Sequence, residues 1–322
     1  MNGGLGGLTV RAPRAEDVPA WAGLIARIGE HEQQSWFEKA EDLEAFLAQH
    51  DATDAILAFD DDGVPRAHGR VSALASDAVV PTRGGVDPAW QRKGVGRAVL
   101  RWQEARAAGI MAGRGVATVA VRAQHEERIL APGRLFASQG FGIVRWFNEM
   151  HRGLSAGLPS EALDPDYELA PWTAESDEEV RLLHNAAFAR HWGSEPRSPQ
   201  SWSFRVGNPE IRRPWCLLVR ERSSGAAVAY HLASHDPDIV RLHGRAEGYT
   251  ELLGVDPAHR GRGLARFLLA EAMRLFTADG MDTAALDMDS GNVTGALALY
   301  EGLGYRVVNR APVWEKTVPV NP

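Results

Sequence analysis

The sequence has one cysteine, no long apolar run and no excess of basic charge. Cys216 stands alone in 322 residues, which excludes an internal disulfide and a cysteine-based metal cluster. Because it lies in an apolar stretch, burial in a strand fits it better than a role as nucleophile. No segment reaches the about 18 apolar residues of a membrane helix. The net charge of -7 argues against nucleic acid or an acidic membrane surface as a partner.

Two further features are missing. The first residues lack the basic and apolar regions of a signal peptide, so we expect a cytoplasmic protein. His231, His235 and His243 show no regular ligand spacing, and we predict no metal site. What the chain does have is 44% hydrophobic residues over 322 positions, enough for two domains with cores of their own.

Residues 254–266 read Gly-Val-Asp-Pro-Ala-His-Arg-Gly-Arg-Gly-Leu-Ala-Arg and lie between a predicted strand and a predicted helix. The helix is indicated by apolar residues at helical intervals, namely Leu264, Phe267, Leu268, Leu275 and Phe276. Such a turn points backbone N–H groups and the positive end of the helix dipole at one place. Its glycines let a phosphate approach closely, and Arg260 and Arg262 add charge. The segment predicts a pyrophosphate site, although the arginines alone would also fit a solvated surface.

The same segment occurs twice, at an offset of 169 residues. Residues 85–97 and 254–266 are identical at seven of thirteen positions, which in the first copy are Gly85, Val86, Asp87, Pro88, Ala89, Gly94 and Arg97. Residues 135–141 and 299–305 also match, at an offset of 164. A period of about 165 residues indicates two domains rather than a solenoid. Because residues 151–166 are rich in Gly, Ser and Pro, we expect a linker there and domains at 1–155 and 156–322.

Each half is predicted to run strand, one or two helices, hairpin, strand, glycine turn, helix, strand, helix and strand. With Gln/Arg-x-x-Gly-x-Gly/Ala at residues 91–96 and 260–265, this order resembles the GNAT superfamily of N-acetyltransferases. Residues 292–305 are similar to that superfamily's second conserved motif. The two-domain arrangement, with His-Trp-Gly at 191–193, resembles the actinobacterial tandem members, a group that includes mycothiol synthase.

The resemblance implies an α/β fold of two tandem GNAT-like domains, each a mixed, mostly antiparallel sheet flanked by helices and splayed in the middle. It implies acetyl-CoA as co-substrate, with its pantetheine amides on the strand edge and its pyrophosphate at the turn. The residues expected to hold it are Leu253, Gly254, Val255, Arg260, Gly261, Arg262, Gly263, Leu264, Ala265 and Asn292, with Val86, Gln91, Gly94 and Gly96 in the first copy. Asn292 anchors the splay or the cofactor amide, or is a plain turn residue.

Acetyl transfer to an amine needs a group that takes a proton from the ammonium and one that gives a proton to the leaving thiolate. Glu251 is our candidate base, because strand alternation places it on one face with Tyr249 and Leu253. It would act directly or through a water, with Glu247 and Tyr249 in reserve. The alternative is an exposed or ion-paired glutamate. Tyr300 matches the family's usual general acid, and the alternative is a tyrosine packed in the core.

The first copy lacks both groups. Thr82 stands at the position of Glu251, and Phe136 at that of Tyr300. We therefore expect the first domain to be catalytically silent, either binding acetyl-CoA unproductively or only shaping the second domain.

The acceptor is the least defined part of the prediction. His184, Arg190, His191 and Trp192 lie at the end of the second domain's first helix, which in this fold borders the acceptor pocket; Trp192 fits a core anchor equally well. The leading interpretation is N-acetylation of a small-molecule primary amine. The first alternative is acetylation of a cysteinyl-sugar amine, as by mycothiol synthase. The others are a non-catalytic acyl-CoA-binding or sensing protein, and N-acetylation of a peptide or protein. The oligomeric state is not indicated.

Overall fold

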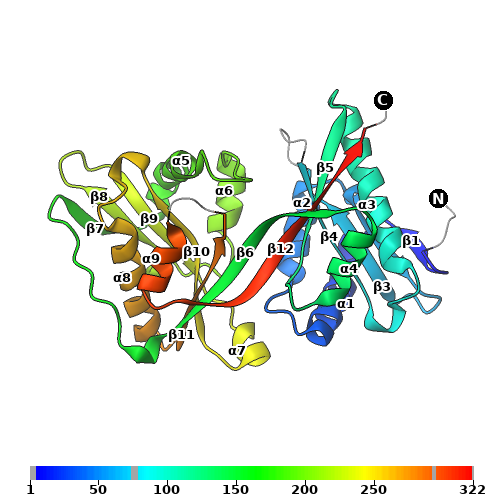
Figure 1. The fold of residues 1–322 in the computed structure, drawn as a ribbon, viewed down its shortest axis with the longest axis horizontal. Coiled ribbons are helices and arrows are strands. Elements are labelled where there is room, and N and C mark those ends of the chain that lie inside the picture. Colours follow the sequence, from blue (N-terminus) through cyan, green and yellow to red (C-terminus); the bar gives the residue numbers. More distant parts are fainter. Residues whose placement is uncertain (1–4, 74–78, 292–294, 321–322) are drawn as a thin grey trace. The chain divides into compact units, whose positions relative to one another are not determined.

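The computed structural model describes residues 5–73, 79–291 and 295–320. The chain divides into two compact units, one of residues 1–146 with 310–322 and the other of residues 147–309. Each unit is a sheet with helices on its faces (Figure 1). Among the described helices, none has the length and apolarity needed to cross a bilayer.

The first unit follows the predicted order of elements. Helix α1 (Val18–Glu32) buries Trp21, Leu24, Ile25 and Ile28 and ends at Gln33, which has a left-handed backbone. Helix α2 (Ala40–Gln49) packs beside it. The remaining elements are β1 (Thr9–Arg11), β2 (Ala55–Phe59), β3 (Pro65–Val71), β4 (Val79–Val86), α3 (Val95–Ala112), β5 (Thr118–Gln124), α4 (Leu130–Ser138) and the start of β6 (Gly142–Gly153).

The second unit repeats this order with one additional short helix. Its helices are α5 (Asp177–Phe188), α6 (Pro199–Val206), the additional α7 (Asp238–His243), α8 (Leu264–Ala278) and α9 (Ala296–Gly302). Its strands are β7 (Tyr167–Pro171), β8 (Leu217–Glu221), β9 (Ala227–Ser234), β10 (Glu247–Val255), β11 (Thr283–Asp289) and the start of β12 (Arg306–Pro319).

Both sheets have the same strand order. The first five strands run β1-β2-β3-β4-β5 in one unit and β7-β8-β9-β10-β11 in the other. Neighbours are antiparallel except for the pairs β4/β5 and β10/β11, which are parallel. The predicted fold, a mixed and mostly antiparallel sheet flanked by helices, is confirmed.

Each parallel pair is joined over only part of its length. In the second unit, residues 247–250 of β10 pair with residues 283–286 of β11, while β10 pairs with β9 up to Val255. In the first unit, residues 79–81 of β4 pair with residues 120–122 of β5. The later residues of β4 and β10 thus keep their antiparallel partner and present their other edge, so the sheet splays at the same place in both units.

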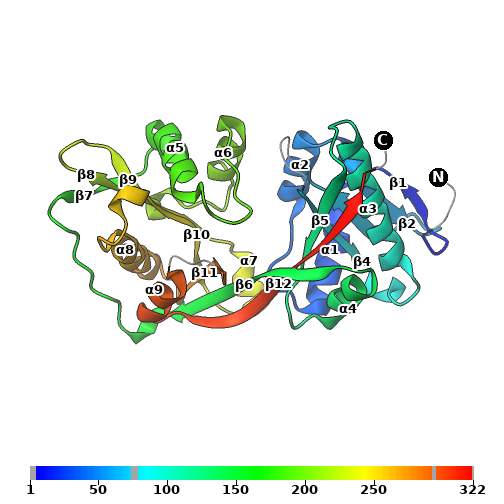
Figure 2. The ribbon, with the colours of Figure 1, turned by 45° about the horizontal axis from the view of Figure 1, so that its top comes forward.

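The sixth strand of each sheet comes from the other sequence repeat. Residues 147–153 of β6 pair with β11, and residues 313–319 of β12 pair with β5. Figure 2 shows the green β6 beside β11 and the red β12 beside β5. Because of this exchange, the compact units do not coincide with the expected segments 1–155 and 156–322.

Helices cover both faces of the second sheet and give it two cores. On one face, α8 packs Leu264, Phe267 and Leu268 against β8, β9 and β10. On the other, α5 and α6 pack Val180, Trp202 and Val206 against Tyr230 and Leu232 of β9. The splayed part of β10 therefore has a face toward α8 and a face toward α5 and α6.

Candidate active site

The glycine turn of the second unit opens helix α8. Gly261 and Gly263 have φ values of 78° and 77°, a left-handed conformation that glycine adopts without steric cost. The first helical hydrogen bond runs from Phe267 N to Gly263 O, at 3.0 Å. The amides of Leu264, Ala265 and Arg266 thus have no acceptor within the helix, and they lie at the positive end of its dipole. The turn has the geometry of an anion site.

Arg260 has a contact that the sequence did not indicate. Its Nε donates to Val255 O at 3.4 Å and its Nη2 to Ala187 O at 2.7 Å. The side chain therefore ties the turn to the C-terminal end of α5. Both arginines are exposed, but Arg260 is held by these two backbone carbonyls.

The turn of the first unit has two hydrogen bonds that correspond to those of the second unit's turn. Asp87 caps it through Ala89 N at 3.0 Å, as Asp256 does through Ala258 N at 2.8 Å. Gln91 Nε2 donates to Val86 O at 3.3 Å, the counterpart of the Arg260 bond to Val255. Helix α3 begins after Gly94 with φ 83°, and Gly96 lies in its first turn. Arg92, at the position of Gly261, also has a positive φ, 63°. The backbone course is shared although the side chains differ.

Glu251 lies in a β-bulge. The pairing of β10 with β9 shifts register between Thr250 and Leu252. The Glu251 carboxylate accepts from Ser234 Oγ at 2.8 Å and from Arg205 Nη1 at 3.3 Å, so it faces α6. Leu253 packs instead in the clusters on the α8 side. The expectation that Glu251 and Leu253 share a face was wrong, because the extra residue of a bulge interrupts the alternation.

A cluster of charged groups that the sequence analysis missed lies across β6, β11 and β10. Asp287 and Glu149 are direct cross-strand partners. Although Asp287 is exposed, surrounding protein atoms and the Glu149 charge raise its pKa to about 7, and a hydrogen bond from Tyr249 partly offsets this. Glu149 also accepts from His151 Nε2 at 2.8 Å. The alternation Asp287-Met288-Asp289 was a visible signal, but Glu149 belongs to the exchanged strand.

Glu247 and Arg245 complete this cluster. Arg245 Nε lies 2.7 Å from the Glu247 carboxylate, and its Nη2 lies 3.7 Å from Glu149. Glu247 is buried and already paired, which makes it a poorer reserve base than Asp287. Burial, followed by the charges of nearby carboxylates, raises the pKa of the Tyr249 phenol well above its usual range, so Tyr249 keeps its proton at neutral pH and is not a base by itself.

Tyr300 lies on α9, half-buried against the core. Burial raises the pKa of its phenol to about 12, and its ring centroid is 6.0 Å from that of Tyr305. Its counterpart Phe136 packs in an aromatic group with His125, Phe141 and Trp314. The Thr82 hydroxyl, at the position of Glu251, donates to Arg122 O on β5 at 2.9 Å. The first unit thus has no ionisable side chain at either position.

Two histidines near the end of α5, His184 and His191, contact side chains of the sheet. His184 Nδ1 lies 2.6 Å from Tyr230 Oη, and burial, followed by the charges of Arg197 and Arg205, lowers its pKa to about 4. His191 Nε2 lies 3.7 Å from Asp289. Both join the α5 region to the sheet.

Several other expected residues occupy packing positions or lie elsewhere. Trp192 is half-buried and Arg190 exposed. Cys216 is buried, and burial raises the pKa of its thiol to about 11, which suits a packing residue. His231 bonds Thr250 Oγ1 at 2.9 Å and His235 bonds Glu247 O at 2.9 Å, while His243 ends α7. Asn292 lies outside the described residues. Over residues 5–73, 79–291 and 295–320, no three His, Cys, Asp or Glu side chains gather as metal ligands.

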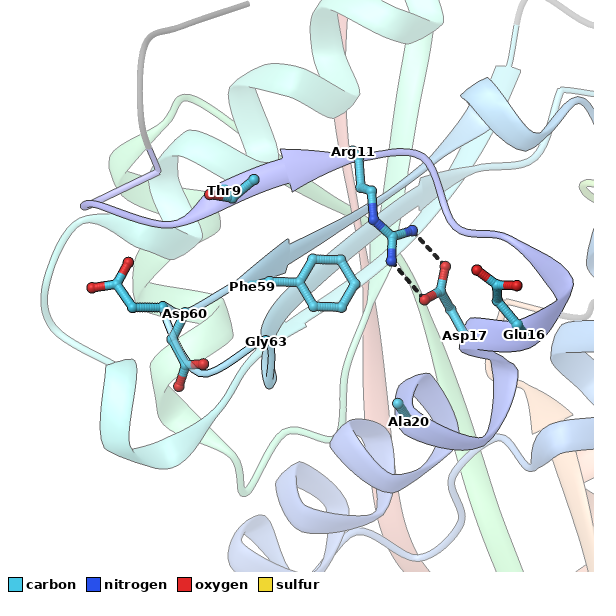
Figure 3. Close-up of a pocket in the computed structure, with 9 residues that line it drawn as sticks. Thr9, Arg11, Glu16, Asp17, Ala20, Phe59, Asp60 and Gly63 are labelled. Carbon is cyan, nitrogen blue, oxygen red and sulfur yellow. Dashed lines mark hydrogen bonds and ion pairs between the residues drawn. The ribbon is translucent and has the colours of Figure 1, made fainter.

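Two cavities lie in the first unit, away from these groups. One, of about 490 Å³, is lined by Thr9, Phe59, Asp60 and the pair Arg11–Asp17, whose side chains are joined by hydrogen bonds of 2.5 and 2.7 Å (Figure 3). The other, of about 290 Å³, lies between α4 and Trp314. None of the predicted site residues lines either cavity.

Residues 168–305 match the family model described as the acetyltransferase (GNAT) family. Mycothiol acetyltransferase of Mycolicibacterium gilvum is 26% identical over 286 residues, which cover 84% of this chain and 86% of that protein. Mycothiol acetyltransferase of Clavibacter michiganensis subsp. michiganensis is 30% identical over 243 residues, covering 74% of this chain and 72% of that protein. These relatives thus span both repeats.

Solved structures are similar over the whole chain. A GCN5-related N-acetyltransferase from Sphaerobacter thermophilus has a TM-score of 0.73 at 23% identity, covering 98% of this chain and 96% of that one. A tandem GNAT protein from the clavulanic acid biosynthesis pathway has a TM-score of 0.73 at 19% identity, covering 98% and 99%. At these identities the likeness shows the fold, two such domains in one chain.

Proposed function

The chain belongs to the GNAT family of acetyltransferases, and from this premise we propose that its second unit moves an acetyl group from acetyl-CoA to the primary amine of a small molecule by direct attack. The observation that carries this proposal is the open edge of β10, which leads into the glycine turn and bears the Glu251 carboxylate.

Acetyl-CoA would be held by backbone more than by side chains. Beyond Thr250 the strand has antiparallel pairing to β9 but no pairing to β11, so Leu253, Gly254 and Val255 can offer polar backbone groups to the pantetheine amides. The amides that open α8 suit the pyrophosphate. Arg262 adds charge there, while Arg260 holds the turn against α5.

Glu251 would take the proton from the acceptor ammonium, directly or through a water. Its two oxygens contact Ser234 and Arg205, which fix the carboxylate on the face toward α5 and α6. The neutral amine nitrogen then attacks the thioester carbon, the C–N bond forms and the C–S bond breaks. The second proton that the nitrogen loses replaces the one that Tyr300 gives to the thiolate, so that one proton in all remains with Glu251. The reserve base is the Asp287 carboxylate, reached through the Tyr249 hydroxyl, because the two side chains are hydrogen-bonded to each other.

Tyr300 would return a proton to the departing thiolate. Burial raises the pKa of its phenol to about 12, so the phenol keeps its proton throughout the neutral range and has one to give. We assign no catalytic role to the first unit, because the Thr82 hydroxyl donates to Arg122 O and Phe136 has no ionisable group. Its turn remains suited to a phosphate group.

Mycothiol acetyltransferase activity, on the amine of a cysteinyl sugar, is the second candidate. It is favoured by the relatives of that name at 26% and 30% identity over most of the chain. A panel that includes amino sugars alongside simple amines distinguishes it from the broader proposal.

The test is release of free thiol from acetyl-CoA with an amine panel, comparing wild type with Glu251→Gln and Tyr300→Phe. We expect each substitution to lower kcat by about 10²- to 10⁴-fold. Thr82→Ala is the matched control at the duplicated position and should leave kcat unchanged. Thermal stabilisation by acetyl-CoA should persist in all three variants.

Unchanged turnover in Glu251→Gln and Tyr300→Phe, with loss in Thr82→Ala, would reverse the assignment of the active unit. Stabilisation by acetyl-CoA without turnover on any amine would favour a binding or sensing protein. A stoichiometry of two acetyl-CoA per chain would show that the first turn also binds it, and one per chain that it does not.

A further inference from the structure

Two arginines lie on the face of the second sheet that carries Glu251. Arg205, on α6, places its Nη1 3.3 Å from the Glu251 carboxylate. Arg197 lies just before α6, and hydrogen bonds to α5 hold its backbone. Its N donates to Asn185 Oδ1 at 2.7 Å, while its O accepts from Arg181 Nη1 at 2.6 Å and from Asn185 Nδ2 at 3.2 Å. The fold therefore fixes the backbone positions from which the two arginine side chains extend.

The Arg197 guanidinium has no hydrogen bond or ion pair among the described residues. Desolvation is the main cause that lowers its pKa, and the charge of Arg205 is the next. Glu195 offsets part of this through its charge, without an ion pair to Arg197. A half-buried cation beside a second cation is unfavourable in the free chain, and an anion placed between them would relieve it.

Both guanidinium groups lie beside the same buried pair, His184 and Tyr230. Burial lowers the pKa of the His184 imidazole and the two arginine charges add to this; burial raises the pKa of the Tyr230 phenol and the same two charges partly offset it. The Tyr230 ring in turn lies directly against Gly254, where an added Cβ would be 2.2 Å from its Cε1. The cations are thus close to the stretch of β10 that is proposed to bind the pantetheine amides.

We infer that Arg205 and Arg197 bind a carboxylate of the acceptor, and that the acceptor is an amine with a carboxylate beside it, as in an α-amino acid. The inference rests on the proposed function and specifies its substrate class. The spacing favours it, because Arg205 touches the carboxylate that would receive the ammonium, and in an α-amino acid the two charges are separated by one carbon. An amino sugar without a carboxylate would leave Arg197 unpaired, and a polycation would be repelled.

The experiment compares matched acceptors. Each standard α-amino acid is assayed beside its α-carboxamide and its decarboxylated amine, by thiol release from acetyl-CoA with the wild-type chain, Arg205→Gln, Arg197→Gln and Arg222→Gln. Arg222 is an exposed arginine of the same unit, paired with Glu168, and controls for the lost charge. Binding of acetyl-CoA is followed separately by thermal stabilisation.

For the preferred acceptor we expect kcat/KM to be at least about tenfold higher for the acid than for its carboxamide, the effect of a charged hydrogen bond. Arg205→Gln and Arg197→Gln should remove most of this preference through KM, and Arg222→Gln should keep it. Equal or better turnover of carboxamides, or turnover confined to amines without a carboxylate, overturns the inference and leaves the proposed function intact. No turnover on any amine despite bound acetyl-CoA overturns both.

Discussion

Replacing Gly254 with alanine should destabilise the second unit more than the same change at its duplicated position, Gly85, destabilises the first. A Cβ on Gly254 would lie 2.2 Å from Tyr230 Cε1 and 2.8 Å from its Cζ. The ring cannot easily move away, because Tyr230 is fully buried, its hydroxyl is 2.6 Å from His184 Nδ1 and its edge meets Trp172. The strand must therefore shift.

Overpacking of a close-packed core costs about 1–3 kcal/mol, and a methyl group driven into a fixed ring belongs at the upper end. For Gly254→Ala we expect about 3 kcal/mol, or a Tm about 6–12 °C lower for a unit of this size. At Gly85 the nearest atom is Ile28 Cδ1, at 2.8 Å, followed by His68 Nε2 at 3.1 Å. Because the end of an isoleucine can rotate, Gly85→Ala should cost about 1 kcal/mol.

Calorimetry and urea titration of the two variants and wild type would measure the difference. If the units unfold in separate transitions, each substitution should shift a different one. Equal losses for the two variants, or a larger loss for Gly85→Ala, would refute the claim that the Tyr230 ring is fixed beneath β10. Gly254→Ala should also weaken stabilisation by acetyl-CoA, which Gly85→Ala should not do to the same extent.

Two further predictions concern stability. The folded chain keeps a proton on Asp287 up to a pKa of about 7, whereas the unfolded chain releases it near 4, so stability contributed by the protonated carboxyl is lost as pH rises through this window. Asp287→Asn should remove that loss, by about 1 kcal/mol after solvent screening, and urea titrations should show a gain at pH 8 that is absent at pH 4; a gain largest at pH 4 would contradict this. At the duplicated turns, Arg92→Gly should stabilise by about 1 kcal/mol and Gly261→Ala destabilise by a similar amount, because both positions have positive φ; thermal unfolding in which neither variant shifts would contradict it.

The duplicated turn was predictable because its signal is local. Gly261, Gly263 and the helical periodicity after them specify backbone geometry within a few residues, and the copy at residues 85–97 repeats it. The order of strands and helices followed from the same periodicities together with the family resemblance. These features depend little on which distant segments meet.

The surroundings of Glu251 were not predictable, because they depend on pairing. A bulge is defined only relative to the partner strand. The sequence of residues 247–255 therefore does not indicate that Leu253 lies on the opposite face of the sheet from Glu251. Glu149 approaches Asp287 only because β6 joins the second sheet. Arg197 lies in the loop before α6, whose position is set by contacts with Asn185 and Arg181 that hydrophobic periodicity does not predict.

The exchange of β6 and β12 also determines the order in which the chain can fold during synthesis. The second unit is continuous in sequence, residues 147–309, and can close once β11 has paired with β6 and α9 and Tyr305 have packed on its core. The first unit begins earlier in the chain but is completed later, because β5 lacks its neighbouring strand until residues 313–319 have been synthesised. Until then the nascent chain carries an unpaired strand edge rich in Val and Ala, the type of edge to which other chains add. A ribosome that stalls late in translation would therefore release a competent second unit attached to an aggregation-prone first one.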